Sequence, residues 1–379
     1  MIYFDSAATT FQKPPGVRNA VWRTMGECSS PGRGGYGAAM RAAETVYACR
    51  EELAALFAVD DPARVVFTMN ATHALNIAIR SLLAEGGHAV ISGYEHNAVT
   101  RPLAALSGVE VTVARAPLFS GEEMVRAFAD AIRPDTRAVI CTHVSNVFGY
   151  VLPLDEIAAL CRRRGVPLVI DAAQSAGMLP LPFDVLGAAF AAMPGHKGLY
   201  GPQGTGVLLC RSADEARPLL CGGTGSFSRE SAMPPELPDR LEAGTHNVPG
   251  IAGLREGVRF LRRTGIDTVR AHERRLLRLA AEGLRRIPGL TVFDTAEEGR
   301  QLSVLSFFAD AMEPEEVARR LAERGVAVRA GLHCAPLAHE SAGTLERGTV
   351  RLSFSAFNGE AEVMNFLKIM RKISAETLL

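Results

Sequence analysis

The stretch VPLVIDAAQSAG, residues 166–177, contains a short apolar run that ends in a carboxylate, Asp171. Short runs rich in valine, isoleucine and leucine are typical of buried strands. Asp171 is therefore expected at the carboxyl end of a strand, where ligands bind in parallel sheets. Two interpretations of Asp171 stay open at this point: the carboxylate meets a cationic nitrogen of a ligand, or it caps a following helix.

Similar runs on both sides of this stretch predict the rest of the sheet. Helical patterns lie between most of the earlier runs, and an alternation of strands and helices favours a largely parallel sheet covered on both faces. The predicted strands are 63–68, 88–92, 109–113, 137–142, 166–171, 189–193 and 206–210, and the predicted helices are 71–85, 97–107, 121–132 and 154–164.

The pattern changes past residue 250 to long amphipathic helices with a few strands. Residues 272–289 place Leu277, Ala280, Leu284 and Ile287 on one stripe, which favours a helix on a domain face over a helix on a membrane surface. Strands over 302–308 and 349–354, with a helix over 313–325 between them, complete a small α+β domain. We predict a large domain over 16–250 and a small domain formed by 1–15 and 251–379.

Composition excludes several classes of protein. The chain has 379 residues, with 41 basic and 41 acidic side chains, so no overall field attracts nucleic acid or an anionic membrane. The apolar run 185–193 is too short to span a bilayer, and MIYFDSAATT lacks the basic start of a signal peptide. Seven cysteines without a CxxC pair argue against a zinc site and a disulfide framework. We expect a cytoplasmic protein with reduced thiols and no metal.

A second stretch, MPGHKGLYGPQGTG at 193–206, holds Lys197 between glycine-rich turns. Glycine lets a ligand approach the main chain closely, although a tight surface turn has the same composition. Lys197 follows Asp171 by 26 residues. An acid that can pair with a pyridinium and a lysine that can form a Schiff base are what pyridoxal phosphate requires.

Two further segments suit the phosphate and the ring of such a cofactor. NATHALN, residues 70–76, places Thr72 and His73 near a helix start, whose free N–H groups attract anions. EHNAV, residues 95–99, follows the next strand and offers His96 as a flat ring. A histidine after a strand is often a cap, but His96 is expected in the same layer of strand ends as Asp171 and Lys197.

Eight motifs together carry a family resemblance. The chain resembles the cysteine desulfurase branch of the class V aminotransferase-like, fold-type I pyridoxal phosphate enzymes, in order from residue 3 to beyond residue 360. The resemblance implies an α/β fold with a large domain built on a mostly parallel sheet and a smaller α+β domain. The motifs are YFDSAATT, PGRGG, EHNAV, HVSNVFG, DAAQSAG, GHKGLYGPQGTG, EAGTHN and RAGLHCAP.

The resemblance also implies the roles of single residues. Lys197 forms the Schiff base, Asp171 pairs with the pyridinium nitrogen, and Gln174 contacts the phenolic oxygen of the ring. His96 stacks on the ring, and Asn146 approaches substrate and cofactor. Thr72, His73 and His196 hold the phosphate, and Thr245 reaches the phosphate of the neighbouring subunit in a homodimer. Arg351 binds the substrate carboxylate, and Cys334 accepts the sulfur.

Four positions depart from the pattern of the family. Pro194 stands where relatives usually carry a hydroxyl that donates to the phosphate. Tyr36, Ser6 and His246 replace the more usual histidine, asparagine and proline. These departures bear on cofactor affinity and substrate preference.

The predicted function is conversion of L-cysteine to L-alanine, with the sulfur left as a persulfide on Cys334 and passed to an acceptor protein. Selenocysteine lyase and class V aminotransferase activities are alternatives, and a sulfur relay or scaffold with little turnover is a third. The motif CGGTGS at 221–226 suggests nucleotide binding only weakly, because no GxxxxGK[ST] or strand-following GxGxxG accompanies it.

Overall fold

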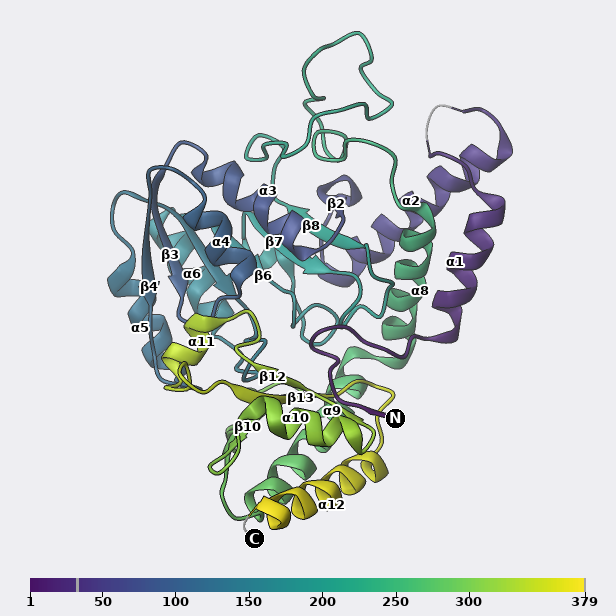
Figure 1. Ribbon diagram of the computed structural model, residues 1–379. Coiled ribbons are helices and arrows are strands. Elements are labelled where there is room, and N and C mark those ends of the chain that lie inside the picture. The colour runs from purple at the N-terminus through teal and green to yellow at the C-terminus, as the bar shows by residue number, and fades with distance from the viewer. Residues whose placement is uncertain (32–33, 378–379) are drawn as a thin grey trace.

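The computed structural model describes residues 1–31 and 34–377, and its larger part is built on one seven-stranded sheet (Figure 1). The strand order is β2-β8-β7-β6-β5-β3-β4. All seven predicted strands are present, and only β8 runs antiparallel to its neighbours. The strands are β2 (Val65–Thr68), β3 (Gly87–Ser92), β4 (Val109–Ala114), β5 (Thr136–Thr142), β6 (Leu168–Asp171), β7 (Phe190–Pro194) and β8 (Gly206–Cys210).

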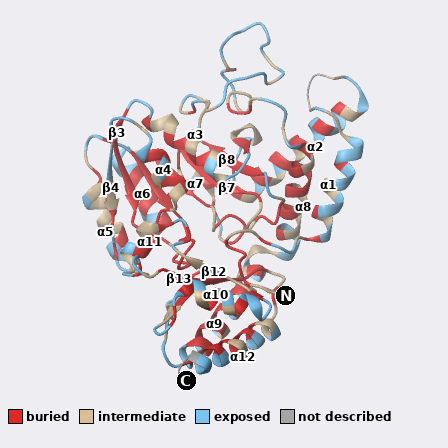
Figure 2. Ribbon diagram, viewed as in Figure 1, coloured by how far each residue is buried: buried red, intermediate tan, exposed pale blue. Residues whose placement is uncertain are grey.

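Helices cover both faces of this sheet, which confirms the predicted α/β class. They are α1 (Pro15–Glu27), α2 (Gly37–Phe57), α3 (Ala71–Leu83), α4 (Asn97–Ala104), α5 (Gly121–Ala131), α6 (Leu154–Arg164), α7 (Phe183–Leu186) and α8 (Val248–Thr264). Successive strand residues alternate between two cores, as the pleat requires. Val66 packs with α3 and α4, whereas Val65 and Phe67 pack on the other face with α2, α5, α6 and α8. Figure 2 shows the strands buried between these layers.

The smaller part has its own core around an antiparallel sheet of order β12-β13-β10-β9. Leu277, Ala280, Leu284 and Ile287 pack into this core, so the stripe predicted over 272–289 is a domain face. The elements are β1 (Ile2–Tyr3), α9 (Ile266–Arg285), β9 (Leu290–Phe293), β10 (Val304–Ala309), α10 (Pro314–Glu323), β11 (Val326–Ala327), β12 (Arg329–Gly331), α11 (Pro336–Ser341), β13 (Thr349–Ser353) and α12 (Glu360–Thr377).

Two segments join the parts in ways that bear on the domain prediction. Phe4, near the N-terminus, packs in the smaller core, whereas Ile251 and Leu254 of α8 pack in the larger one. The division at 15/16 and 250/251 stays a prediction. Residues 211–247 form a long irregular segment that extends away from the sheet (Figure 1).

The described part of the chain holds no helix of the length and apolarity needed to cross a membrane.

Candidate active site

Asp171 ends β6 at the carboxyl edge of the sheet and is buried. One of its carboxylate oxygens accepts a hydrogen bond of 2.8 Å from the N–H of Ala173. Burial raises the pKa of Asp171, while that hydrogen bond and the charge of Lys197 oppose the rise. A turn follows instead of a helix, so Asp171 is not a helix cap.

Lys197 follows β7 and begins a turn that closes when the N–H of Tyr200 donates to the carbonyl of Lys197 at 2.9 Å. Burial lowers the pKa of Lys197 to about 8, although the carboxylate of Asp171 raises it. Much of the amine population is therefore neutral near pH 8, which suits a nucleophile.

Two of the glycines around Lys197 allow close packing of protein segments. A Cβ at Gly198 would lie 2.4 Å from the carbonyl oxygen of Ala176, and one at Gly195 would lie 2.2 Å from the hydroxyl of Thr205. These two glycines let the lysine turn pack against neighbouring protein segments, and the close approach of a ligand to the turn stays a prediction.

A cavity of about 220 Å³ collects most of the predicted cofactor residues. Its wall combines a buried carboxylate, a lysine, two histidines and several polar side chains from the ends of the strands. The predicted residues that line it are Thr72, His96, Asn146, Asp171, Gln174, His196 and Lys197, together with Pro194.

The N-terminus of α3 forms one end of this cavity. Asn70 caps the helix by accepting from the N–H of His73 at 2.9 Å, and Thr72 faces the cavity. The first N–H groups of a helix favour an anion. The ring of His73 lies elsewhere, in a second hollow that Thr245 and His246 also line. Thr245 is exposed on the irregular segment.

His96 serves both as a cap and as part of the cavity wall. Its Nδ1 accepts from the N–H of Ala98 at 2.9 Å at the start of α4. Burial, with the nearby charges of Lys197 and Arg351, lowers the pKa of His96 to about 4. The ring is therefore neutral at physiological pH, and a flat neutral ring is suited to stacking.

Arg351 lies buried in β13. It donates to the carbonyl of Asn146 at 2.9 Å and to the carboxylate of Asp5 at 2.8 Å. Nothing within residues 1–31 and 34–377 accepts from its Nε. Arg329 donates to the second oxygen of Asp5 at 3.0 Å.

Cys334 is exposed, in the loop between β12 and α11. Its carbonyl accepts from the N–H of Asn97 at 2.7 Å, and the side chain of Asn146 donates to the carbonyl of His333 at 2.9 Å. His333 and Cys334 both adopt left-handed backbone conformations, with φ of 52° and 56°, which cost free energy in residues other than glycine. Two anchors thus hold a strained loop beside the cavity.

Cys221 is a second exposed thiol, on the irregular segment, which the sequence did not single out. The thiols of Cys49, Cys141, Cys161 and Cys210 are buried.

Several residues near the site were not predicted. Lys13 donates to the carbonyl of His196 at 2.9 Å, and burial lowers the pKa of Lys13 to about 8. Glu95 is fully buried and accepts from the N–H of Thr142 at 2.7 Å, and burial raises its pKa to about 8. Asp5, which pairs with Arg351, is a third. The contacts named here join segments that are distant in the chain, so no local pattern indicates these partners.

The four departures from the family pattern lie in different places. Pro194 lines the cavity, and the buried hydroxyl of Ser6 has no partner among the described residues. His246 contacts Glu242 at 2.9 Å. Tyr36 is exposed just before α2, and part of the PGRGG motif before it (32–33) falls outside the described residues.

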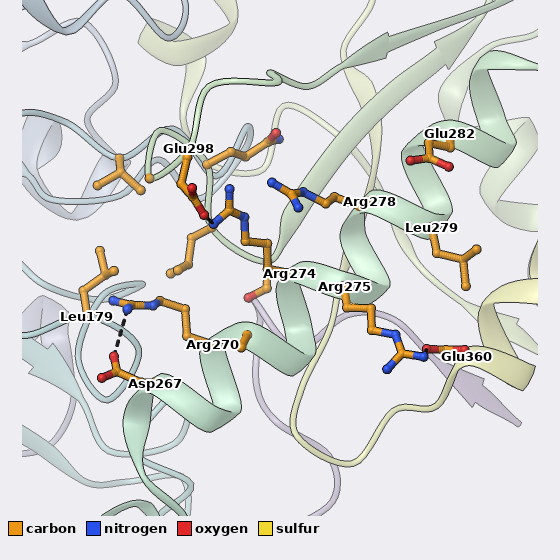
Figure 3. A pocket seen from close by; sticks show the side chains of 16 residues that line it. Leu179, Asp267, Arg270, Arg274, Arg275, Arg278, Leu279, Glu282, Glu298 and Glu360 are labelled. Carbon is orange, nitrogen blue, oxygen red and sulfur yellow. Dashed lines mark hydrogen bonds and ion pairs between the residues drawn. The ribbon is translucent and has the colours of Figure 1, made fainter.

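A larger hollow, of about 1090 Å³, runs along α9 and contains none of the predicted site residues (Figure 3). Four arginines of the helix line it, but four acidic side chains line it too. Arg270 pairs with Asp267 at 2.8 Å, and Arg274 pairs with Glu298. The charges balance, so this hollow lacks the electrostatic character of an anion site.

A comparison with known proteins shows the family of this chain. The family described as aminotransferase class-V matches residues 2–366, and the chain belongs to this family.

Individual relatives of the chain in this family are named cysteine desulfurases. A probable cysteine desulfurase of Mycolicibacterium paratuberculosis is 34% identical over 99% of this chain. One of Methanothermobacter thermautotrophicus is 32% identical over 98% of this chain and 94% of its own length. The structure of a cysteine desulfurase from Thermococcus onnurineus superposes with a TM-score of 0.90 at 29% identity, covering 99% of this chain and 95% of that one. The chain spans only 55% of the mycobacterial relative's length.

Proposed function

We propose that this protein is a cysteine desulfurase that uses pyridoxal 5′-phosphate and converts L-cysteine to L-alanine, leaving a persulfide on Cys334. The observation that carries the proposal is the pair of anchors between the Cys334 loop and the cavity. Asn97 follows His96 directly, and Asn146 lines the cavity itself. A transaminase needs no thiol at this place.

The residues present fit the cofactor. A buried carboxylate, Asp171, is suited to hold a protonated pyridine nitrogen, and Lys197 supplies the amine that holds the aldehyde carbon. Thr72, the first N–H groups of α3 and His196 are suited to the phosphate. Gln174 and His96 complete the wall. Bound pyridoxal phosphate supplies an electron sink for the carbanion at Cα of the substrate.

The chain's own side chains then perform the remaining work. Arg351 binds the substrate carboxylate through its guanidinium, whose Nε has no acceptor among the described residues. The neutral amine of Lys197 takes the proton from Cα and later returns a proton to the three-carbon fragment. The Cys334 thiolate attacks the substrate sulfur, the carbon–sulfur bond breaks, and the sulfur stays on Cys334 as a persulfide. The fragment leaves as alanine.

We propose further that the protein is a homodimer in which Thr245 reaches the phosphate of the neighbouring subunit. Thr245 is exposed and lines a hollow other than the chain's own cavity, which supports this arrangement. The seven cysteines are all free, which is consistent with a cytoplasmic location, and the exposed Cys334 is accessible to a sulfur-acceptor protein.

The test is product analysis with purified protein, pyridoxal phosphate and L-cysteine. We expect alanine and, with a reductant, an equal amount of sulfide. The Lys197→Ala variant should form neither, whereas Lys368→Ala, at an exposed lysine of α12, should behave as the wild type. Transfer of the amino group to a keto acid without sulfide would indicate an aminotransferase, and turnover of L-selenocysteine alone would indicate a lyase.

A further inference from the structure

Tyr200 closes the turn that begins at Lys197 and is buried, with 1% of its surface exposed. Its backbone is left-handed, with φ of 56°. This conformation favours glycine, and it persists in other residues only where the surroundings fix it. A tyrosine at this position is therefore expected to make side-chain contacts that a glycine could not make.

The hydroxyl of Tyr200 joins the lysine turn to two other segments. It donates to Oε1 of Glu273, on α9, at 3.2 Å. It accepts from the N–H of Ala356 at 3.0 Å, on the segment that follows β13 and Arg351. One phenol thus connects the segment that carries the lysine with the strand that carries the arginine.

Glu273 is a buried carboxyl group with no other part in the site. Burial raises its pKa to about 8, although hydrogen bonds from Ser303 and Tyr200 lower it. Glu273, Tyr200 and Lys197 line the same small cavity, of about 30 Å³, which is the room of roughly one water molecule. Polar groups buried in this way are ordinarily retained for their hydrogen bonds.

The opposite side of the turn is also fixed. Gly198 lies against Ala176, where a Cβ would be 2.4 Å from the carbonyl oxygen. Ala176 belongs to the turn that follows Asp171. The lysine turn is therefore held between the aspartate segment on one side and the phenol with its two partners on the other.

We infer that Tyr200 and Glu273 are positioning residues that hold the amine of Lys197 in place for the cofactor. The inference rests on the proposed function, because that function makes Lys197 the cofactor-binding residue. Neither residue touches the reacting atoms, and both act through the turn.

The test measures how fast cofactor-free protein captures pyridoxal phosphate, followed by its absorbance and by borohydride fixation on Lys197. Tyr200→Phe keeps the ring contacts with Phe260 and Phe357, at centroid distances of 5.3 and 5.7 Å, and removes only the hydroxyl. We expect capture to slow by roughly tenfold or more, because small misplacements of a reacting group have effects of this size. In turnover, kcat should fall while KM for L-cysteine stays within about twofold. This is the pattern expected when a substitution removes an interaction that stabilises only the transition state.

Two comparisons separate positioning from stability. Tyr94→Phe removes the hydroxyl of an equally buried tyrosine that does not line the cavity. That hydroxyl donates to the carbonyl of Ala116 at 3.0 Å, and the variant should capture pyridoxal phosphate at the wild-type rate. Glu273→Gln keeps an acceptor for Tyr200 and should retain most of the rate, whereas Glu273→Ala should resemble Tyr200→Phe. Thermal unfolding of each variant shows that it is folded.

The inference would be overturned if Tyr200→Phe captured pyridoxal phosphate at the wild-type rate, or if Tyr94→Phe slowed this capture as much as Tyr200→Phe does. Failure of the proposed function is seen separately, as absence of alanine from L-cysteine in the wild type, because the capture rates do not depend on that substrate.

Discussion

The amine of Lys197 is held in surroundings that change its chemistry. Burial lowers its pKa to about 8, and the carboxylate of Asp171 raises the pKa from where burial alone would leave it. The amine is charged below this pH and neutral above it, and only the neutral form attacks an aldehyde. Capture of pyridoxal phosphate should rise with pH and level off above about 8.

Asp171→Asn should move the midpoint of this titration to lower pH, because the supporting negative charge is lost. The measurement is the capture rate of cofactor-free protein from about pH 6 to about pH 11, a range that includes both the lowered pKa of Lys197, about 8, and the ordinary lysine pKa of about 10.4. A midpoint near the ordinary lysine value of about 10.4 would show that the amine is not desolvated.

Arg351 is the second residue to which the proposed function assigns a chemical task. Arg351→Ala should weaken apparent binding of L-cysteine by roughly 2–5 kcal/mol, the cost of removing one partner of a buried charged pair. Asp5 keeps its contact with Arg329, so the fold should survive. Binding is followed by the change in cofactor absorbance, with Arg371→Ala, an exposed arginine of α12, as the control. Unchanged affinity would remove Arg351 from the substrate site.

Single residues show how far their places in the fold can be predicted from the sequence. Asp171 and Lys197 could be predicted because parallel strands bring their carboxyl ends to one edge, whatever their separation along the chain. The contact of Arg351 with Asp5 spans 346 positions and has no local signal. Glu273, which meets Tyr200 across 73 positions, was missed for the same reason.

At the scale of elements, a buried ion pair joins α2 to the irregular segment. Arg50 donates to Glu242 at 2.7 Å, and Glu242 also accepts from the N–H of Phe67 at 2.6 Å. Burial alone raises the pKa of Glu242, but the charge of Arg50 and the hydrogen bonds of His246 and Arg50 outweigh it, so the pKa is lowered.

Glu242→Gln should destabilise the protein by roughly 3–5 kcal/mol at pH 7, because the charge of Arg50 stays buried without its partner. The carboxylate contributes stability above its unfolded pKa of about 4.3, and this contribution is lost as the pH falls through the lower folded pKa. The difference from the wild type should therefore shrink in acid.

The measurement is the thermal unfolding midpoint at several pH values. Glu340→Gln, which breaks the half-exposed pair of Arg115 and Glu340 at 3.0 Å, is the control and should cost below about 1 kcal/mol. Equal effects of the two substitutions would show that the Arg50 pair does not stabilise the segment.

The elements themselves were largely predictable, since apolar runs of strand length alternated with helical patterns. The glycines near Lys197 show the limit of that approach. Their composition predicts that a ligand approaches the main chain, and the structure shows in addition that Gly195 and Gly198 allow protein segments to meet. Composition reports that a close approach occurs and not which group makes it.

At the scale of the whole molecule, the N-terminal segment crosses from the smaller part to the site. Phe4 packs in the smaller core and Asp5 pairs with Arg351. Lys13 donates to the carbonyl of His196, the residue that precedes Lys197. No property of residues 1–13 taken alone indicates these partners. They follow from the arrangement of the two parts around the strand ends.

The same arrangement brings Cys334, from the smaller part, beside a cavity built by the larger sheet. The central claim is that Cys334 receives the sulfur of L-cysteine, and peptide mass spectrometry after one turnover without reductant tests it most directly. We predict a mass increase of one sulfur atom on the peptide containing Cys334, with alanine formed in equal amount, and neither product in Cys334→Ser. An adduct on Cys221 instead, or undiminished alanine from Cys334→Ser, would contradict the account.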